Sequence, residues 1–271
     1  MTALKEFNTY GEEIQRLMAL RTYPLAVKML ESEADIPEGA MRPKKDRNYH
    51  LAQCQVFGLS RGQGLSVAML KEDNWCWGPL MSYGLVDPRL GEKYAEIEID
   101  MKVIPRLEYG KYVGIVSAPL KTANFEPDIV MIYSNPAQLN NMIHSLMWIG
   151  EGFVTSSFFP TVSCGFSVVP ALSGQYYITI PDCGEYGRGL TGEDELIFSV
   201  PKDKVKVLVS QLKKFEVTKM GYKDNPFLET TGDFVRPQFY KDLYRECGLD
   251  ADDASTWGGD TKELVRYLSE K

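Results

Sequence analysis

The sequence predicts an α+β (or α/β) fold made of two weakly similar halves related by a pseudo-two-fold axis. Strand-like and helical segments alternate along the 271 residues. Several connections between neighbouring strands are too short for a crossover helix, which favours mixed sheets over purely parallel ones. A stretch that carries two cysteines also occurs twice. Together these observations predict two related halves that pack against each other.

The repeat is visible in the spacing of cysteine and glycine. Cys54 lies ten residues before Gly64, and Cys164 lies ten residues before Gly174. An apolar, β-prone run follows each glycine and leads to a second cysteine. These second cysteines are Cys76 and Cys183. The repeat divides the chain into an N-terminal half at 1–120, a C-terminal half at 121–219 and a helical tail at 220–271.

The first half begins with apolar residues at helical spacing over 4–20, which predict an amphipathic helix. Pro24 ends this helix, and the run 25–30 predicts a buried strand. A polar loop, a helix over 50–59 and a strand over 65–70 complete the pattern. The segment 74–79 is predicted to be a loop.

The second half starts with a strand over 128–133, which follows Pro127 as the first strand follows Pro24. Pro136 is typical of a helix start and predicts a helix to about residue 150. The remaining elements are predicted as a strand at 153–159, a helix at 164–172, strands at 175–180 and 195–200, a helix from 201, a linking strand at 112–116 and a tail helix at 237–247.

Composition and charge exclude several classes of function. The formal net charge of −7 argues against a nucleic-acid partner, because binding to phosphates relies on a basic surface. No apolar run approaches the ~20 residues of a membrane span. The N-terminus lacks the basic start and apolar centre of a secretory signal, so we expect a cytoplasmic protein without structural disulfides. The aromatic content makes a homodimer plausible.

Cys54, Cys76, Cys164 and Cys183 give the clearest indication of function. Four thiolates are the number that a tetrahedral metal or a [4Fe–4S] cluster requires. We expect the first cysteine of each pair near a helix start and the second in a glycine-rich loop, whose amides donate to cluster sulfurs. Neither pair has the C-x-x-C spacing of ferredoxins or zinc ribbons. An iron-sulfur cluster is favoured over zinc, with cysteines buried in the core as the alternative without a metal.

Several segments resemble one known family. They are the run 25–30, the loop 42–44, Ala52 to Gln55, the stretch from Gly64 to Cys76, Ser163 to Gly165 and Pro181 to Gly184. Over roughly residues 24–215 the chain resembles the family called domain of unknown function 169, which is found largely in anaerobic bacteria and archaea. The resemblance implies neither an established reaction nor a set of catalytic residues. An anaerobic setting would suit an oxygen-sensitive cluster.

A catalytic cysteine is a second hypothesis, and it requires a base close to the thiol. The sequence contains two histidines, His50 and His144. His50 lies four residues before Cys54, so on a helix it would share a face with that thiol or replace a cysteine as a metal ligand. A polar residue at a helix start is the simpler interpretation of His50. His144 is more simply a surface or interface histidine, and Cys247 is most simply a structural residue or a free thiol.

Two arginines and two tryptophans are candidates for ligand binding. Arg61 and Arg188 lie in glycine-containing segments and could bind a small anionic substrate, although neither segment has a nucleotide-binding pattern. Trp75 and Trp77 flank Cys76, where they predict a lid over a buried site or a surface for a partner.

Three classes of function therefore stay open. The first is a redox or ligand-binding protein whose halves hold a metal cofactor, with a redox partner. The second is a cysteine-dependent or metal-dependent enzyme, for which the sequence identifies no catalytic residue. The third is a binding or interaction protein whose cysteines belong to the core.

Overall fold

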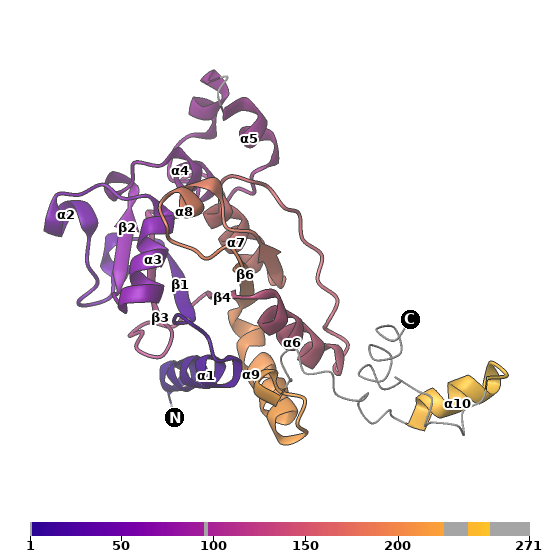
Figure 1. Ribbon diagram of the computed structural model, residues 1–271. Helices are drawn as coiled ribbons and strands as arrows, with labels where there is room; N and C mark the ends of the chain where they lie inside the picture. The colour runs from indigo at the N-terminus through magenta and orange to yellow at the C-terminus, as the bar shows by residue number, and fades with distance from the viewer. Residues whose placement is uncertain (1, 95–96, 225–237, 250–271) are drawn as a thin grey trace, which may run out of the picture. The chain divides into compact units, whose positions relative to one another are not determined.

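A computed structural model describes residues 2–94, 97–224 and 238–249 (Figure 1). The chain divides into two compact units, Met1–Asp224 and Asn225–Lys271. In the second unit, the amphipathic helix α10 (Gln238–Glu246) has no buried residue. No helix in the described part of the chain is long and apolar enough to cross a membrane.

The first unit is built on one six-stranded sheet in the order β2-β3-β1-β4-β6-β5, and all of its strand pairs are antiparallel. The strands are β1 (Leu25–Leu30), β2 (Val67–Leu70), β3 (Gly114–Pro119), β4 (Ile129–Ser134), β5 (Tyr177–Thr179) and β6 (Leu196–Pro201). The α+β class is therefore confirmed, but both halves contribute to a single antiparallel sheet rather than to mixed sheets.

The strand order is the same when it is read outward from either side of the central β1–β4 pair. This pair aligns Leu25 with Met131 and Val27 with Ile129. On one side follow β3 and then β2, and on the other side follow β6 and then β5. Along the chain, each central strand is followed by helices, then by an edge strand and then by an inner strand. The pseudo-two-fold relation between the halves stays a prediction.

Helices cover both faces of the sheet (Figure 1). One core cluster packs α1, α6 and α9 against side chains such as Ala26 and Leu30 of β1. The other packs α3, α4 and α7 against Leu25, Val27 and Met29, as the alternation of side chains along a strand requires. The first layer consists of α1 (Ala3–Met18), α6 (Pro136–Met147) and α9 (Lys202–Val217). The second consists of α3 (Gln53–Gln63), α4 (Trp77–Ser82), α7 (Ser163–Leu172) and the short α8 (Cys183–Gly187).

Smaller elements fill the connections. They are η1 (Glu33–Asp35), α2 (Pro43–Arg47), η2 (Lys71–Asp73), η3 (Pro88–Lys93), α5 (Glu98–Val103) and η5 (Tyr222–Asp224). The sequence pattern did not reveal α2, η3 or α5, because each is short and has little helical periodicity.

The predicted strand at 153–159 is wrong, since no strand forms there. The segment lies beside β5 but bonds to it through side chains. The Ile178 N–H donates to Ser156 Oγ at 2.9 Å, and the Ser157 N–H donates to Tyr177 Oη at 3.0 Å. Phe153 is 90% exposed, so its apolar side chain does not join the core. Apolar composition alone therefore gave a misleading strand prediction.

The predicted helix at 50–59 begins later, at Gln53. Leu51 forms an isolated β-bridge with Asn74, which holds the preceding backbone in an extended conformation. His50 therefore precedes α3 and does not share a helical face with Cys54. The predicted loop at 74–79 is also shorter than expected, because α4 begins at Trp77.

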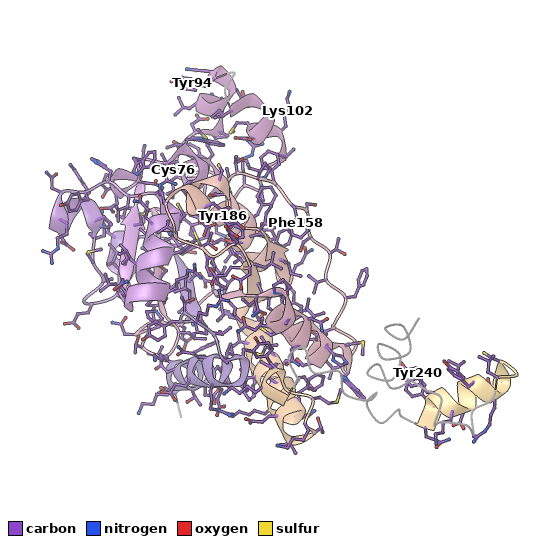
Figure 2. All side chains as sticks on the ribbon, in the orientation of Figure 1. Cys76, Tyr94, Lys102, Phe158, Tyr186 and Tyr240 are labelled. Atoms are coloured by element: carbon purple, nitrogen blue, oxygen red, sulfur yellow. The ribbon has the colours of Figure 1, made fainter. Side chains whose placement is uncertain are left out.

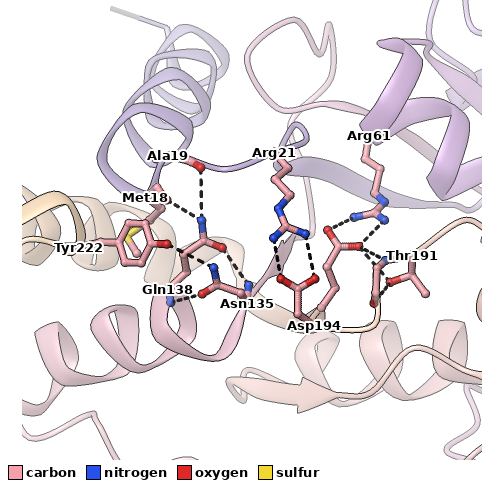
Figure 3. A network of polar contacts seen from close by, with 11 residues as sticks. Met18, Ala19, Arg21, Arg61, Asn135, Gln138, Thr191, Asp194 and Tyr222 are labelled. Atoms are coloured by element: carbon pink, nitrogen blue, oxygen red, sulfur yellow. Dashed lines mark hydrogen bonds and ion pairs between the residues drawn. The ribbon is translucent and has the colours of Figure 1, made fainter. Parts of the chain in front are cut away.

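A buried ion pair joins the two halves (Figure 3). Arg61, near the end of α3, donates to both carboxylate oxygens of Glu195, at 3.0 and 2.8 Å, just before β6 begins. The guanidinium also stacks 3.7 Å from the centre of the Tyr133 ring. Nearby, Arg21 pairs with Asp194 at the surface, at 2.6 Å. Ion pairs thus connect the two halves in addition to the hydrogen bonds of the sheet.

We expect Gly11→Ala and Gly62→Ala to have opposite effects on stability. A Cβ at Gly11 would lie 2.6 Å from the Lys121 backbone nitrogen, whereas a Cβ at Gly62 would meet nothing within 4 Å. Gly62→Ala should raise the free energy of unfolding by about 0.5–1 kcal/mol through helix propensity. Gly11→Ala should lower it by about 1–3 kcal/mol through overpacking. Urea unfolding measures both, and a stabilised Gly11→Ala protein would contradict the packing of α1.

Candidate functional site

All four cysteines of the repeat line one cavity of about 380 Å³, which we call the thiol cavity. They are Cys54, Cys76, Cys164 and Cys183. Trp75, Trp77 and Arg188 also line it, so most of the residues predicted to form a site lie together. The cavity is within the first unit, on the face of the sheet that α3 and α7 cover. Figure 2 shows Cys76 and, on α8, Tyr186 toward the same end of the sheet.

Each thiol lies at the start of a helix. Cys54 is the second residue of α3, and Cys164 is the second residue of α7. Cys76 is the N-cap of α4, and Cys183 is the first residue of α8. The expectation of a loop therefore holds for Cys76, which precedes α4, whereas Cys183 belongs to a short helix. Cys54 and Cys164 occupy the same position in their helices, while the positions of Cys76 and Cys183 differ by one residue.

Backbone hydrogen bonds hold the two thiols of each half together. In the first half the Leu51 N–H donates to Asp73 O at 2.9 Å, and the Trp75 N–H donates to Leu51 O at 3.3 Å. In the second half the Cys183 N–H donates to Pro160 O at 3.2 Å. In both halves the segment before one thiol is therefore tied to the segment before the other.

Asp182 links α7 to α8. Its carboxylate accepts the backbone N–H of Ser163, the first residue of α7, and the N–H of Glu185 in α8, each at 3.0 Å. Glu185 is 1% exposed and accepts from Ser163 Oγ and from Tyr133 Oη, both at 2.7 Å. Burial raises the pKa of Glu185, while the Ser163 and Tyr133 hydrogen bonds oppose that rise. These contacts fix the positions of Cys164 and Cys183.

Close packing brings α4 against α7. Val162, the N-cap of α7, has a φ of 57°, which is rare for a β-branched residue and stores strain at the cavity wall. A Cβ at Gly78 would lie 3.1 Å from Val162, and a Cβ at Gly165 would lie 2.3 Å from Ser82 Oγ. Tyr83 Oη donates to Cys164 O at 3.0 Å. A side chain at Gly165 would therefore clash with Ser82, and one at Gly78 would press against Val162.

Burial keeps three of the thiols protonated. It raises the pKa of Cys54 to about 12, with Asp182 and Glu185 adding to the rise and Arg188 opposing it. Burial also raises the pKa of Cys76, and it raises that of Cys164 well above its ordinary value. A catalytic cysteine needs a thiolate, so these three thiols are poorly suited to act as nucleophiles without a metal.

A hydrogen-bond donor points at one of the sulfurs, because Arg188 Nη1 lies 3.7 Å from Cys54 Sγ. The backbone N–H of Gly78 opposes the rise that burial causes in the pKa of Cys76. Arg188 is held by the Gly184 carbonyl at 2.8 Å and by the Trp75 ring, whose centre is 5.2 Å away. Such donors stabilise thiolates and cluster sulfurs.

The structure does not bring the other predicted residues to the cavity. His50 is exposed and does not line it. Arg61 is buried in its pair with Glu195 and does not line the cavity, so its binding of an anion stays a prediction without support from this geometry. His144 packs edge-on against Phe215. Cys247 is exposed in the second unit.

Sequence reasoning missed four polar residues of the cavity wall: Gln53, Asp100, Thr161 and Asp182. Asp182 could have been found, because the spacing of Asp182 and Glu185 is that of a capping box. Gln53 and Thr161 carry no comparable signal, since a single polar residue beside a helix start has many ordinary explanations.

A metal ion or a cluster requires its ligands at defined distances. Within residues 2–94, 97–224 and 238–249, no group of three or more His, Cys, Asp or Glu side chains is placed to hold a metal ion. A single zinc ion draws its sulfur ligands to about 2.3 Å. In a [4Fe–4S] cluster each cysteine binds a different iron, so the sulfurs surround a larger volume.

The fold and site define an antiparallel α+β protein with a cavity lined by thiols from both halves. A family model described as uncharacterised ArCR, domain of unknown function 169, matches residues 13–211. The chain belongs to this family, as the sequence resemblance indicated. Comparison with curated proteins gave no match, and comparison with solved structures gave none either.

We expect Arg61→Met to destabilise the protein without affecting the cavity. The change leaves the Glu195 carboxylate, which is 7% exposed, without its guanidinium. Leaving a buried charge without its partner costs about 3–5 kcal/mol. Urea unfolding measures the loss, and the double variant Arg61→Met/Glu195→Gln should recover part of it. A loss below about 1 kcal/mol would contradict a buried pair that joins the halves.

We also expect the metal-free protein to lose stability at high pH. An ordinary thiol has a pKa of 9.0, whereas that of folded Cys54 is about 12. Between these values the unfolded state releases a proton that the folded state keeps, so the free energy of unfolding falls as the pH rises. Cys54→Ala should reduce this slope by up to about 1.4 kcal/mol per pH unit. Cys247→Ala is the matched control, and equal slopes in both variants would refute the assignment.

Proposed function

We propose that this protein binds a metal cofactor in the thiol cavity, and that the cofactor is an iron-sulfur cluster of the [4Fe–4S] type. Its ligands would be Cys54, Cys76, Cys164 and Cys183. The observation that carries the proposal is that each half places two thiols on the wall of the same cavity. Four cysteine thiolates are the usual ligands of such a cluster.

The surroundings of the thiols support a negatively charged centre. The N-termini of α3 and α7 lie at the cavity, and helix N-termini carry partial positive charge that favours anions. Arg188 adds a full positive charge close to Cys54. Hydrogen bonds to sulfur and nearby charge also set the reduction potential of a cluster. When bound, the cluster would supply electron transfer or a Lewis-acidic iron.

Metal binding would also change the protonation state of the thiols. A bound metal deprotonates a coordinating thiol, so each ligand exchanges a proton for the metal. Because burial raises the pKa of three of the thiols, this exchange should weaken steeply as the pH falls. Zinc is the alternative metal, and it would require the thiols to move closer together.

The wider role that we propose is redox chemistry or small-ligand binding in anaerobic metabolism, with a redox partner. A cytoplasmic location fits this role, because a reducing compartment keeps the thiols free for the metal. We also propose a homodimer, supported by exposed apolar side chains at the end of α6 and just after it. These are Met147, Trp148, Ile149 and Phe153. A cysteine-dependent enzyme is less well supported, since the His50 base lies outside the cavity and three thiols are protonated.

Single cysteine variants test the proposal. Cys54→Ser and Cys164→Ser should lose most of the bound iron and acid-labile sulfide, since each removes one of four ligands. Cys247→Ser is the control, and it should retain both. All proteins are purified without oxygen, and circular dichroism checks that they fold. Equal iron content in the three variants would exclude the four-thiol site.

A further inference from the structure

A short basic region lies close to the thiol cavity in an otherwise acidic protein. The stretches 42–47 and 71–73 hold five basic and three acidic side chains, although the whole chain has a formal net charge of −7. Three of the basic side chains belong to α2, and Lys71 begins η2. These two elements pack together, and Figure 1 shows α2 beside β2, an edge strand of the sheet. The positive charge is therefore concentrated in one place.

A buried carboxylate fixes the position of α2. Asp73 is 0% exposed, and its Oδ1 accepts the backbone N–H of Lys44 at 2.8 Å. Its Oδ2 accepts from Arg42 Nε at 2.6 Å and from the Leu70 N–H at 2.8 Å. The Arg42 guanidinium also pairs with Glu72 at 2.5 Å. Because the core holds α2 in this way, its other basic side chains form a defined pattern.

Those other basic side chains are available to a partner. Lys45, Arg47 and Lys71 are exposed and make no ion pair with another described residue. Lys44 is half-buried, and it likewise has no carboxylate partner in the described part of the chain. The acid of α2 is Asp46, whose carboxylate accepts the backbone N–H of the residue before α2 at 2.7 Å. Basic groups therefore outnumber the acid on this helix.

The segment after α2 leads from these charges to the thiol cavity. The Trp75 N–H donates to Leu51 O at 3.3 Å, which ties the wall of the cavity to this segment. Tyr49 is 66% exposed and Trp75 is 55% exposed. The Trp75 ring centre lies 5.2 Å from the guanidinium of Arg188, which in turn lies 3.7 Å from Cys54 Sγ. Trp75 therefore connects the exposed surface with a thiol of the cavity.

The combination of charge and aromatic side chains is typical of a protein-binding surface. Tyrosine, tryptophan and arginine contribute most often to the binding energy of interfaces. Opposite charges steer two proteins together, and like charges oppose wrong orientations. An acidic partner would thus be attracted here and repelled by the rest of this acidic protein. A nucleic acid would extend beyond the small basic region and meet that negative surface, so a compact acidic protein fits better.

We propose that this face docks a small acidic electron-transfer protein. We call it the basic face, and its residues are Lys44, Lys45, Arg47, Tyr49, Lys71 and Trp75. The cations contact carboxylates of the partner, and the two aromatic rings form the centre of the interface. Electron-transfer interfaces are commonly small and transient. The inference rests on the proposed function, because it gives the chemistry of the redox partner proposed there.

Flavodoxin, a small acidic electron carrier, is the probe for this inference. Isothermal titration calorimetry on the full-length protein at low ionic strength should show one flavodoxin bound per chain. Raising the salt concentration to about 0.3 M should weaken this binding at least tenfold, because salt screens exposed charges. A single-stranded oligonucleotide is titrated in parallel. Absence of flavodoxin binding at low salt, or tighter binding of the oligonucleotide, would overturn the proposal.

Charge-reversal variants assign the binding to the basic face. Lys45→Glu/Arg47→Glu should weaken flavodoxin binding at least tenfold at low salt, because repulsion replaces attraction. The matched control is Lys206→Glu/Lys214→Glu, at exposed positions of α9, which changes the net charge equally and should retain the affinity. Circular dichroism checks folding, and Lys71→Glu replaces the first variant if that variant does not fold. Equal affinities of the variant and the control would refute the basic face.

Iron and sulfide are measured in the same samples, so that the two proposals fail separately. Flavodoxin binding at the basic face by protein that lacks iron and sulfide would support the docking surface and refute the cluster. Protein with a full complement of iron and sulfide that does not bind flavodoxin would refute the docking surface alone.

Discussion

The antiparallel pairing of β1 with β4 is the constraint on which the site depends. It joins two halves of matching strand order into one sheet and places α3 and α7 on the same face. The start of each of these helices carries one thiol to a common cavity. The short helices α4 and α8 then bring the second thiol of each half. Neither half alone contains the whole wall.

Burial disfavours the ionised form of the thiols at the wall of the thiol cavity. Desolvation raises the pKa of Cys54, Cys76 and Cys164, although Arg188 and the nearby helix N-termini favour negative charge. Without a metal, desolvation is the larger effect and these thiols stay neutral. A bound cation would favour the ionised thiols instead, because its positive charge stabilises the buried thiolates. The same buried environment that prevents cysteine nucleophilicity thus favours a metal centre.

Much of the architecture could be predicted from the chain. The run 25–30 gives β1 at the predicted residues, and the tail helix at 237–247 appears as α10 within a residue at either end. The spacing of the four cysteines also indicated that they would meet, because repeated elements in one sheet occupy equivalent positions. Periodicity and repetition are properties of the sequence itself, so they can be recognised without knowledge of tertiary contacts.

Other features depend on contacts between distant residues. The bridge from Leu51 to Asn74 shortens the predicted helix and separates His50 from Cys54. The partner of Arg61 is Glu195, a residue 134 positions away, and local sequence gave no sign of that pair. The burial of the Gln53 amide, which has no hydrogen-bond partner among the described residues, likewise depends on packing between distant segments. Such features arise from tertiary packing, which one sequence does not reveal.

The most direct measurement is the iron and acid-labile sulfide content of the unmodified protein, purified without oxygen, together with its Mössbauer spectrum. A cluster held by the four thiols predicts about four irons and four sulfides per chain, with the isomer shift of tetrahedral iron–sulfur sites. Protein that lacks iron and sulfide, and also fails to acquire them from ferrous iron, sulfide and a thiol reductant, would contradict the account.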